Sequence, residues 1–170
     1  MNPPHPDDVA AVHNLIGALK RARERRGVSQ ATLAEHVGLS KEHVGDLERN
    51  PTLQMRMGTV WRIAVGVGVV VTYRLDGLVD PPQETALSAS MWAMWEQTGD
   101  PSYLAGRLMA RIAAARRWLG LDVRHVGRSM GASDSYVYLI ERPKGDVEIG
   151  TALGLCRALG GRLAIDVTDA

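Results

Sequence analysis

The stretch that decides the fold is residues 29–49, which read SQATLAEHVGLSKEHVGDLER. Ala34 is small enough for two helices to cross closely, and Gly38 suits a turn that needs a positive φ angle. Val44 and Leu47 are spaced to anchor the following helix on a core. The opposite face of that helix then points outward. The pattern therefore predicts two short helices joined by a tight turn, with the second helix presented to solvent.

Capping residues set the limits of these helices and of their neighbours. Ser29 and Ser40 are suitable N-caps, and Asn50-Pro51 ends the second helix. On either side, apolar positions at helical spacing predict further helices, and a β-branched run predicts a strand. The predicted elements are helices at 7–26, 30–37, 41–49 and 57–65 and a strand at 69–73.

The chain nearly repeats this pattern at an offset of 93 residues, which becomes 92 after the loop that follows the third helix. Gly38 corresponds to Gly131, and Ser40 to Ser133. Beyond the loop, Gly58-Thr59 corresponds to Gly150-Thr151, and a second strand is predicted at 162–167. Because an unpaired strand edge is an association hazard, we expect the two strands to pair with each other or with those of another subunit.

Between the copies lies an acidic connector, residues 77–100, with four Asp or Glu and no Lys or Arg. A helix is predicted over residues 83–97, with Trp92 and Trp95 on one face. This face either docks on a neighbouring core or forms a dimer interface. The predicted domains are an N-terminal DNA-binding domain (1–76), a helical linker (77–100) and a C-terminal domain (101–170).

Residues 29–40, together with Val44 and the run Leu47-Glu48-Arg49, resemble the lambda-repressor/Cro (XRE) helix-turn-helix family. The resemblance covers about residues 10–66. It implies that the exposed helix enters the DNA major groove while the preceding helix lies across the backbone.

Residues 105–160 resemble the same family more weakly, since Val123 replaces the usual Gln and Gly127 the usual Ala. The fold class implied is mainly α. It consists of two lambda-repressor-like helix-turn-helix units joined by a helical linker, each followed by a short strand. The second unit either contacts DNA or is a degenerate copy kept as a scaffold or dimerisation module.

The resemblance implies which residues contact bases. Lys41 can donate to guanine O6 and N7, and Glu42 or Asp46 can accept from cytosine N4; alternatively, these acids are solvated surface groups. The base-contacting set is Ser40, Lys41, Glu42 and Asp46 in the first unit and Ser133, Asp134, Ser135 and Tyr138 in the second.

A further set is expected to contact phosphates or to position the recognition helices. Arg23 with Glu48, and Arg116 with Glu141, match the family's pairing between the opening helix and the recognition helix. His43 is either a surface residue or a phosphate contact. The complete set is Gln30, Arg23, His43 and Arg49 in the first unit and Arg116, Arg124, Arg128, Arg142 and Lys144 in the second.

Composition is compatible with this interpretation and excludes several others. The net charge is +1, divided as +2 for residues 1–76, −4 for 77–100 and +3 for 101–170, so two basic parts flank the connector. Cys156 is the single cysteine, which excludes an intrachain disulfide framework. No leader or membrane span is apparent, which predicts a bacterial cytoplasmic, nucleoid-associated protein. No catalytic or metal-binding motif occurs, so we expect no enzyme activity, cofactor or metal.

These features predict a sequence-specific repressor of transcription that binds double-stranded DNA. Because the two recognition helices differ, a monomer would bind an asymmetric operator through successive major grooves, about 10 bp apart. A homodimer through Trp92, Trp95 or the strands is the alternative arrangement. The Ala/Arg/Gly/Val-rich composition resembles immunity repressors of temperate actinobacterial phages of the mycobacteriophage type. The alternative function is an antitoxin-type regulator that binds a protein partner through its Met/Trp face and autoregulates its operon.

Overall fold

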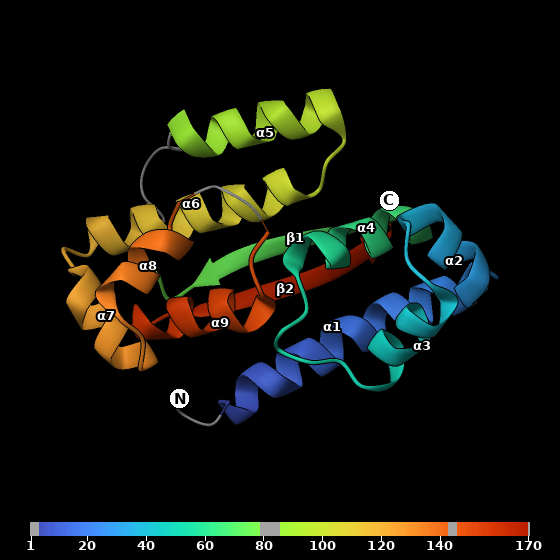
Figure 1. Ribbon diagram of the computed structural model, residues 1–170, viewed down its shortest axis with the longest axis horizontal. Helices are drawn as coiled ribbons and strands as arrows, with labels where there is room; N and C mark the ends of the chain where they lie inside the picture. Colours follow the sequence, from blue (N-terminus) through green and yellow to red (C-terminus); the bar gives the residue numbers. More distant parts are fainter. Residues whose placement is uncertain (1–3, 79–85, 143–145, 170) are drawn as a thin grey trace.

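A computed structural model of the protein describes residues 4–78, 86–142 and 146–169 (Figure 1). Most of these residues are helical, and no helix within these ranges is both long and apolar enough to cross a membrane. We call residues 6–76 the N-terminal half and residues 102–169 the C-terminal half. The elements are α1 (Pro6–Arg25), α2 (Gln30–Val37), α3 (Lys41–Arg49), α4 (Met57–Val67), β1 (Val69–Asp76), α5 (Ala86–Thr98), α6 (Ser102–Trp118), α7 (Val123–Met130), α8 (Asp134–Ile140), α9 (Ile149–Ala158) and β2 (Arg162–Asp169).

The helices of the N-terminal half follow the sequence prediction. Ser29 Oγ accepts a hydrogen bond from Thr32 N at 3.0 Å, and Ser40 Oγ accepts one from His43 N at 3.1 Å, so both predicted N-caps are confirmed. Gly38 ends α2 with a φ angle of 67°, in the left-handed region that favours glycine. The limits of α2 and α3 agree with the predicted ranges.

The C-terminal half contains α6, α7, α8 and α9 in the same order, followed by β2. The carboxylate of Asp122 caps α7 by accepting from His125 N at 2.7 Å, and Ser133 Oγ caps α8 by accepting from Tyr136 N at 3.2 Å. Gly131 ends α7 with a φ angle of 65°. The local structure therefore parallels that of the N-terminal half.

The strands β1 and β2 pair antiparallel with each other, which is one of the two predicted arrangements. In the register, Tyr73 pairs with Ile165, and the offset of 92 makes these two corresponding positions. A separate bridge joins Arg56 to Glu148, which also correspond at this offset. Corresponding positions meet in this way where two copies of one unit pair about a two-fold axis.

Each half supplies hydrogen-bond acceptors to the first turn of the other half's last helix. In α4, Met57 N donates to Val147 O at 2.8 Å and Gly58 N donates to Asp146 Oδ1 at 2.7 Å. In α9, Ile149 N donates to Met55 O and Gly150 N donates to Leu53 O, both at 2.9 Å. The N–H groups of a first helical turn have no partner within their own helix. The two halves therefore cap one another.

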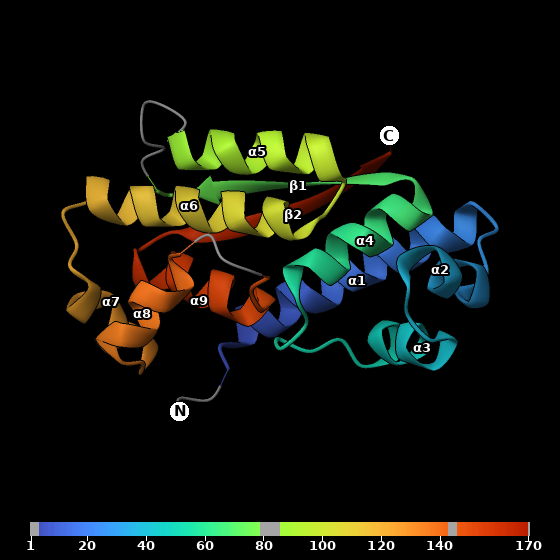
Figure 2. The same cartoon turned by 45° about the horizontal axis from the view of Figure 1, so that its top comes forward.

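One hydrophobic core runs through both halves. It includes Val12 and Val60 of the N-terminal half and Leu108 and Leu155 of the C-terminal half, all at most 1% exposed. The pairs α2–α3 and α7–α8 lie at opposite ends of the molecule's long axis, with the strands between them (Figures 1 and 2). The architecture thus holds two helix pairs apart on a common frame.

The connector contributes α5, which packs along α6. Trp92 and Trp95 contact each other with ring centroids 4.8 Å apart, and the guanidinium of Arg107 in α6 lies 4.6 Å from the Trp92 ring centroid. The Trp face is therefore turned toward α6, which favours docking over a dimer interface. The predicted start of the helix at Gln83 lies outside the described residues.

Candidate nucleic-acid interface

The predicted recognition helix of the N-terminal half, α3, presents a polar and charged face to solvent. Val44 is 1% exposed and Leu47 packs against the core, so both anchors hold the helix from one side. Figure 2 shows α3 along the lower edge of the molecule, away from the strands. The predicted DNA-contacting residues within this helix and at its N-cap are exposed, namely Ser40, Lys41, Glu42, His43, Asp46 and Arg49.

One acidic and one basic residue on this face form an ion pair with each other. Asp46 Oδ1 lies 2.5 Å from Arg49 Nη2, and both side chains are 66% exposed. A pair so exposed contributes at most about 1 kcal/mol, so it can open when a ligand competes for either partner. Ser40, in contrast, uses its hydroxyl oxygen as an acceptor for the α3 cap. Its hydroxyl hydrogen is what it can offer to DNA.

A buried ion pair fixes α3 to α1. Arg23 Nε and Nη2 donate to the two carboxylate oxygens of Glu48 at 2.6 and 2.9 Å, and Arg23 Nη1 donates to Val28 O at 2.7 Å. Gln30 Nε2 donates to Glu48 Oε2 at 2.8 Å. Burial raises the pKa of Glu48, but the hydrogen bonds from Arg23 and Gln30 and the charge of Arg23 outweigh it, so the pKa lies below its usual value.

The hydrogen bond to Glu48 raises the pKa of Arg23 against the opposing effect of burial. Arg23 is only 7% exposed. Its guanidinium is therefore better suited to orienting α3 than to contacting a phosphate. Gln30, half-buried and bonded to Glu48, joins the same network at the start of α2.

The same ion pair is present in the C-terminal half. Arg116 Nε and Nη2 donate to Glu141 at 2.5 and 2.8 Å, and Arg116 Nη1 donates to Leu121 O at 2.7 Å. The hydrogen bond to Glu141 raises the pKa of Arg116. At the position of Gln30 stands Val123, which is 8% exposed and has no amide to donate. The Arg–Glu ion pair is therefore present in both halves, but the hydrogen bond that Gln30 donates to Glu48 has no counterpart in the C-terminal half.

The outward face of α8 differs from that of α3. Asp134 is half-buried and lies 3.5 Å from Arg124, while the hydroxyl oxygen of Ser133 caps the helix. Ser135 is exposed, and Tyr138 is 57% exposed. Leu139, which sequence reasoning did not select, is 61% exposed. Its alignment with Asp46 at the offset of 93 was the available signal.

The predicted phosphate-contacting arginines of the C-terminal half lie on the surface around α7 and α8. Arg124, Arg128 and Arg142 are all exposed. Lys144, predicted for the same role, lies outside the described residues. Arg124 is within 3.5 Å of Asp134 in α8 and Arg142 follows the end of α8, so these two positive charges lie near that helix.

A glycine is required for steric reasons at position 127 in α7, where the sequence departs from the family pattern. A Cβ atom at Gly127 would lie 2.8 Å from Ala132 O and 3.4 Å from Asp134 Oδ1. The backbone between α7 and α8 therefore approaches α7 more closely than any side chain permits. Ala34, at the corresponding position of α2, is accommodated and 4% exposed.

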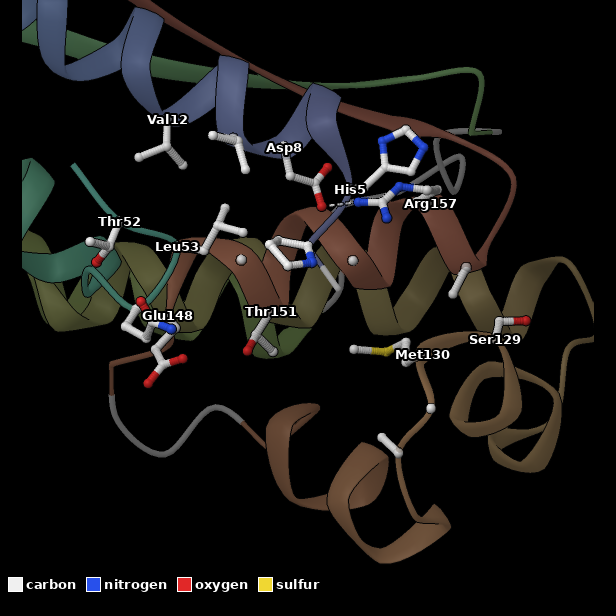
Figure 3. A pocket seen from close by; sticks show the side chains of 18 of the residues that line it. His5, Asp8, Val12, Thr52, Leu53, Ser129, Met130, Glu148, Thr151 and Arg157 are labelled. Carbon is white, nitrogen blue, oxygen red and sulfur yellow. Dashed lines mark hydrogen bonds and ion pairs between the residues drawn. The ribbon is translucent and has the colours of Figure 1, made fainter. Parts of the chain in front are cut away.

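An open groove of about 1100 Å³ lies between the start of α1, the loop at residues 51–54 and the helices α7–α9 (Figure 3). Asp8 of α1 and Arg157 of α9 form an ion pair there, and Ser133 at the start of α8 lies at its edge. The pair ties the two halves together. Among the described residues, no three His, Cys, Asp or Glu side chains are grouped so that they could hold a metal ion.

Comparison with known proteins identifies one part of this arrangement. Residues 19–69 match a helix-turn-helix family, so the chain carries a helix-turn-helix domain there. The chain is 37% identical over 74 residues to the HTH-type transcriptional regulator SutR of Escherichia coli K12. The aligned part is 44% of this chain and spans 39% of that relative. No solved structure matches the chain significantly. The family match includes α2, α3 and α4 and ends before α5.

Proposed function

We propose that the protein is a sequence-specific repressor of transcription that binds double-stranded DNA. The observation that carries this proposal is the exposed polar face of α3 within the helix-turn-helix domain at residues 19–69. The similarity to a transcriptional regulator agrees with it. Binding, without catalysis, is the activity we infer.

We further propose that the C-terminal half is a second helix-turn-helix unit and that one chain spans both half-sites of its operator. The pairing of Tyr73 with Ile165 and of Arg56 with Glu148 supports this, because a homodimer brings corresponding residues together in the same way. Two units related by such an axis contact inverted half-sites. Since α3 and α8 carry different residues, the half-sites differ in sequence and the operator is asymmetric.

A role in phage immunity is the more specific form of the proposal. It rests on the resemblance of this Ala/Arg/Gly/Val-rich chain to immunity repressors of temperate actinobacterial phages. The competing antitoxin function relied on a Met/Trp face available to a protein partner. Trp95 is half-buried, and Trp92, although 36% exposed, lies against Arg107 of α6, so part of this face is covered by the molecule itself. The engagement of this face with α6 supports the repressor proposal over the antitoxin alternative.

The experiment that tests the proposal is selection of binding sites from random DNA with the full chain, followed by footprinting. We expect a site with two half-sites in successive major grooves, about 10 bp apart, that differ in sequence. A perfect palindrome would contradict the two-headed arrangement. Failure to select any sequence would contradict DNA-binding regulation itself.

A further inference from the structure

We propose that α8 recognises thymine methyl groups through Leu139 and Tyr138, so that the half-site of the C-terminal half is specified mainly by apolar contacts. The inference rests on the proposed function and adds the chemistry of one half-site to it. It makes Leu139 a specificity-determining residue, and it assigns the two halves different kinds of base recognition.

The geometry of α8 leads to this assignment. Val137 is fully buried and Ile140 packs against the core, so these residues fix which side of the helix faces inward. At 100° per residue, Ser135, Tyr138 and Leu139 fall on the opposite side. Tyr138 and Leu139 are 57% and 61% exposed, among the most exposed large apolar side chains of the described chain.

Other side chains at the start of α8 are engaged elsewhere. The hydroxyl of Tyr136 lies 3.3 Å from Thr151 Oγ1 in α9, and Asp134 lies 3.5 Å from Arg124 in α7. These contacts direct Tyr136 and Asp134 toward neighbouring helices. The middle of the outward face is consequently left to Ser135, Tyr138 and Leu139.

The corresponding positions of α3 carry residues of a different chemical kind. Asp46 stands at the position of Leu139, and Gly45 at that of Tyr138. In the major groove, a carboxylate accepts from cytosine N4, whereas an apolar side chain packs against the C5 methyl group that only thymine presents there. Replacing Asp by Leu therefore changes the preferred base from cytosine to thymine.

DNA is the occupant that the surroundings of this face favour. Arg124 and Arg128 are exposed on α7 and Arg142 is exposed just after the end of α8, where they can complement the phosphates that border a major groove. The face also belongs to the helix that the strand register relates to α3, the recognition helix of the helix-turn-helix domain. An apolar face together with exposed arginines is what a groove lined with thymine methyl groups would fit.

The test uses the full wild-type chain and the selected operator, with each thymine replaced in turn by deoxyuridine, which lacks only the methyl group. We expect a loss of affinity of roughly three- to fivefold for one or more positions in the half-site contacted by α8, as for one buried methyl group. The same replacement in the α3 half-site should have little effect. Lys41→Ala, which should relax base preference only in the half-site contacted by α3, shows which half of the protein covers each half-site.

A variant links the effect to the side chain. Leu139→Ala should bind the normal operator as weakly as the wild type binds the sensitive deoxyuridine operator, and it should no longer distinguish the two. Leu119→Ala, a control at an exposed leucine at the end of α6, should behave like the wild type. Circular dichroism melting checks that both variants are folded.

Three outcomes would overturn the inference. One is specific binding that no deoxyuridine replacement weakens. Another is a Leu139→Ala variant that keeps the full methyl sensitivity. The third is normal operator binding by Leu139→Ala together with loss of a protein that copurifies with the wild type. In each of these cases the proposed repressor function still stands, whereas absence of any specific DNA binding would remove both.

Discussion

The helix pairs α2–α3 and α7–α8 share a frame and differ in the surface that the frame presents. Both have a buried Arg–Glu pair, a serine cap on the exposed helix and a glycine with positive φ in the turn. The exposed Asp46 corresponds to the exposed Leu139, whereas the buried Gly45 corresponds to the exposed Tyr138. The Arg–Glu pair, the cap and the turn that hold the exposed helix are therefore retained in both halves, while the residues on its outward face differ.

One difference inside the frame accompanies the change of face. A Cβ atom at Gly45 would lie 3.5 Å from Gln30 Oε1. In the C-terminal half, the Gln30 position is occupied by Val123 and the Gly45 position by Tyr138. In the C-terminal half, therefore, the amide side chain is absent and an aromatic side chain is present at two positions that are neighbours in space in the N-terminal half. The hydrogen bond to the Glu of the ion pair is lost with the amide.

The largest expected effect concerns this ion pair. Removing one partner of a buried pair leaves the other charge uncompensated and costs about 3–5 kcal/mol. Arg116→Ala should lie at the upper end of this range, because Val123 offers Glu141 no hydrogen bond. Arg23→Ala should cost less, since Gln30 still donates to Glu48. Urea unfolding of both variants measures the difference, and Gln30→Val added to Arg23→Ala should abolish it. Equal costs for the two single variants would contradict the role given to Gln30.

The next effect concerns the close approach at α7. Gly127→Ala should destabilise the protein by about 1–3 kcal/mol, because the added Cβ atom would meet Ala132 O. The matched variant Ala34→Gly should cost about 0.5–1 kcal/mol through backbone entropy. Thermal melting of both proteins provides the comparison. Helix propensity alone predicts the opposite sign for Gly127→Ala, so a gain in stability would show that the turn is not sterically tight.

DNA binding should separate the two classes of exposed basic residue. Lys41→Ala should relax the base preference at one position, a change of about 1–3 kcal/mol in discrimination. Arg128→Ala should weaken binding to all sequences alike and reduce the salt slope by about one unit. Binding titrations over a range of salt concentrations with matched and mismatched operators test both. If Lys41→Ala weakens all sequences equally, its base contact is refuted.

The smallest effect is a pH dependence that arises where the halves cap one another. Burial raises the pKa of Asp146 above its usual value, despite the hydrogen bond from Gly58 N and the nearby Arg56. The folded state therefore gains stability relative to the unfolded state as pH falls through that pKa, and it loses this contribution as pH rises. Asp146→Asn keeps an acceptor for Gly58 N and removes the titration.

At neutral pH, the Asn variant should be as stable as the wild type or slightly more stable, by less than the net contribution of a hydrogen bond, about 1 kcal/mol. The difference should shrink on acidification as Asp146 becomes protonated. Urea unfolding between pH 3 and pH 7 measures it. A difference that grows as pH falls would mean that the charged carboxylate is the favoured form.

Local signals in the sequence were sufficient for much of the fold. The caps at Ser29 and Ser40 and the left-handed Gly38 depend on nearby residues, so α2 and α3 could be predicted to the residue. Pairing of the strands with each other could be predicted only as one of two arrangements, since both satisfy the same edges. The caps of α4 and α9 could not be foreseen, because Asp146 lies far from α4 in the sequence and Leu53 lies far from α9.

The candidate interface was predictable where a residue's type matches its role. Charged residues such as Lys41, Glu42 and Arg128 were selected because they can form hydrogen bonds to DNA. Leu139 was missed because a leucine in a helix is ordinarily a core residue, and its exposure depends on how α8 is anchored. The position of Asp134 against Arg124 likewise depends on the packing of α7 on α8.

Pairing of β1 with β2 inside one polypeptide also bears on how the proposed repressor would respond to copy number. A dimeric repressor falls apart on dilution, and its operator occupancy then drops more steeply than its concentration. In the proposed two-headed repressor, the second recognition helix is tethered to the first, at an effective concentration that dilution does not alter. Operator occupancy by such a monomer should follow protein concentration to the first power.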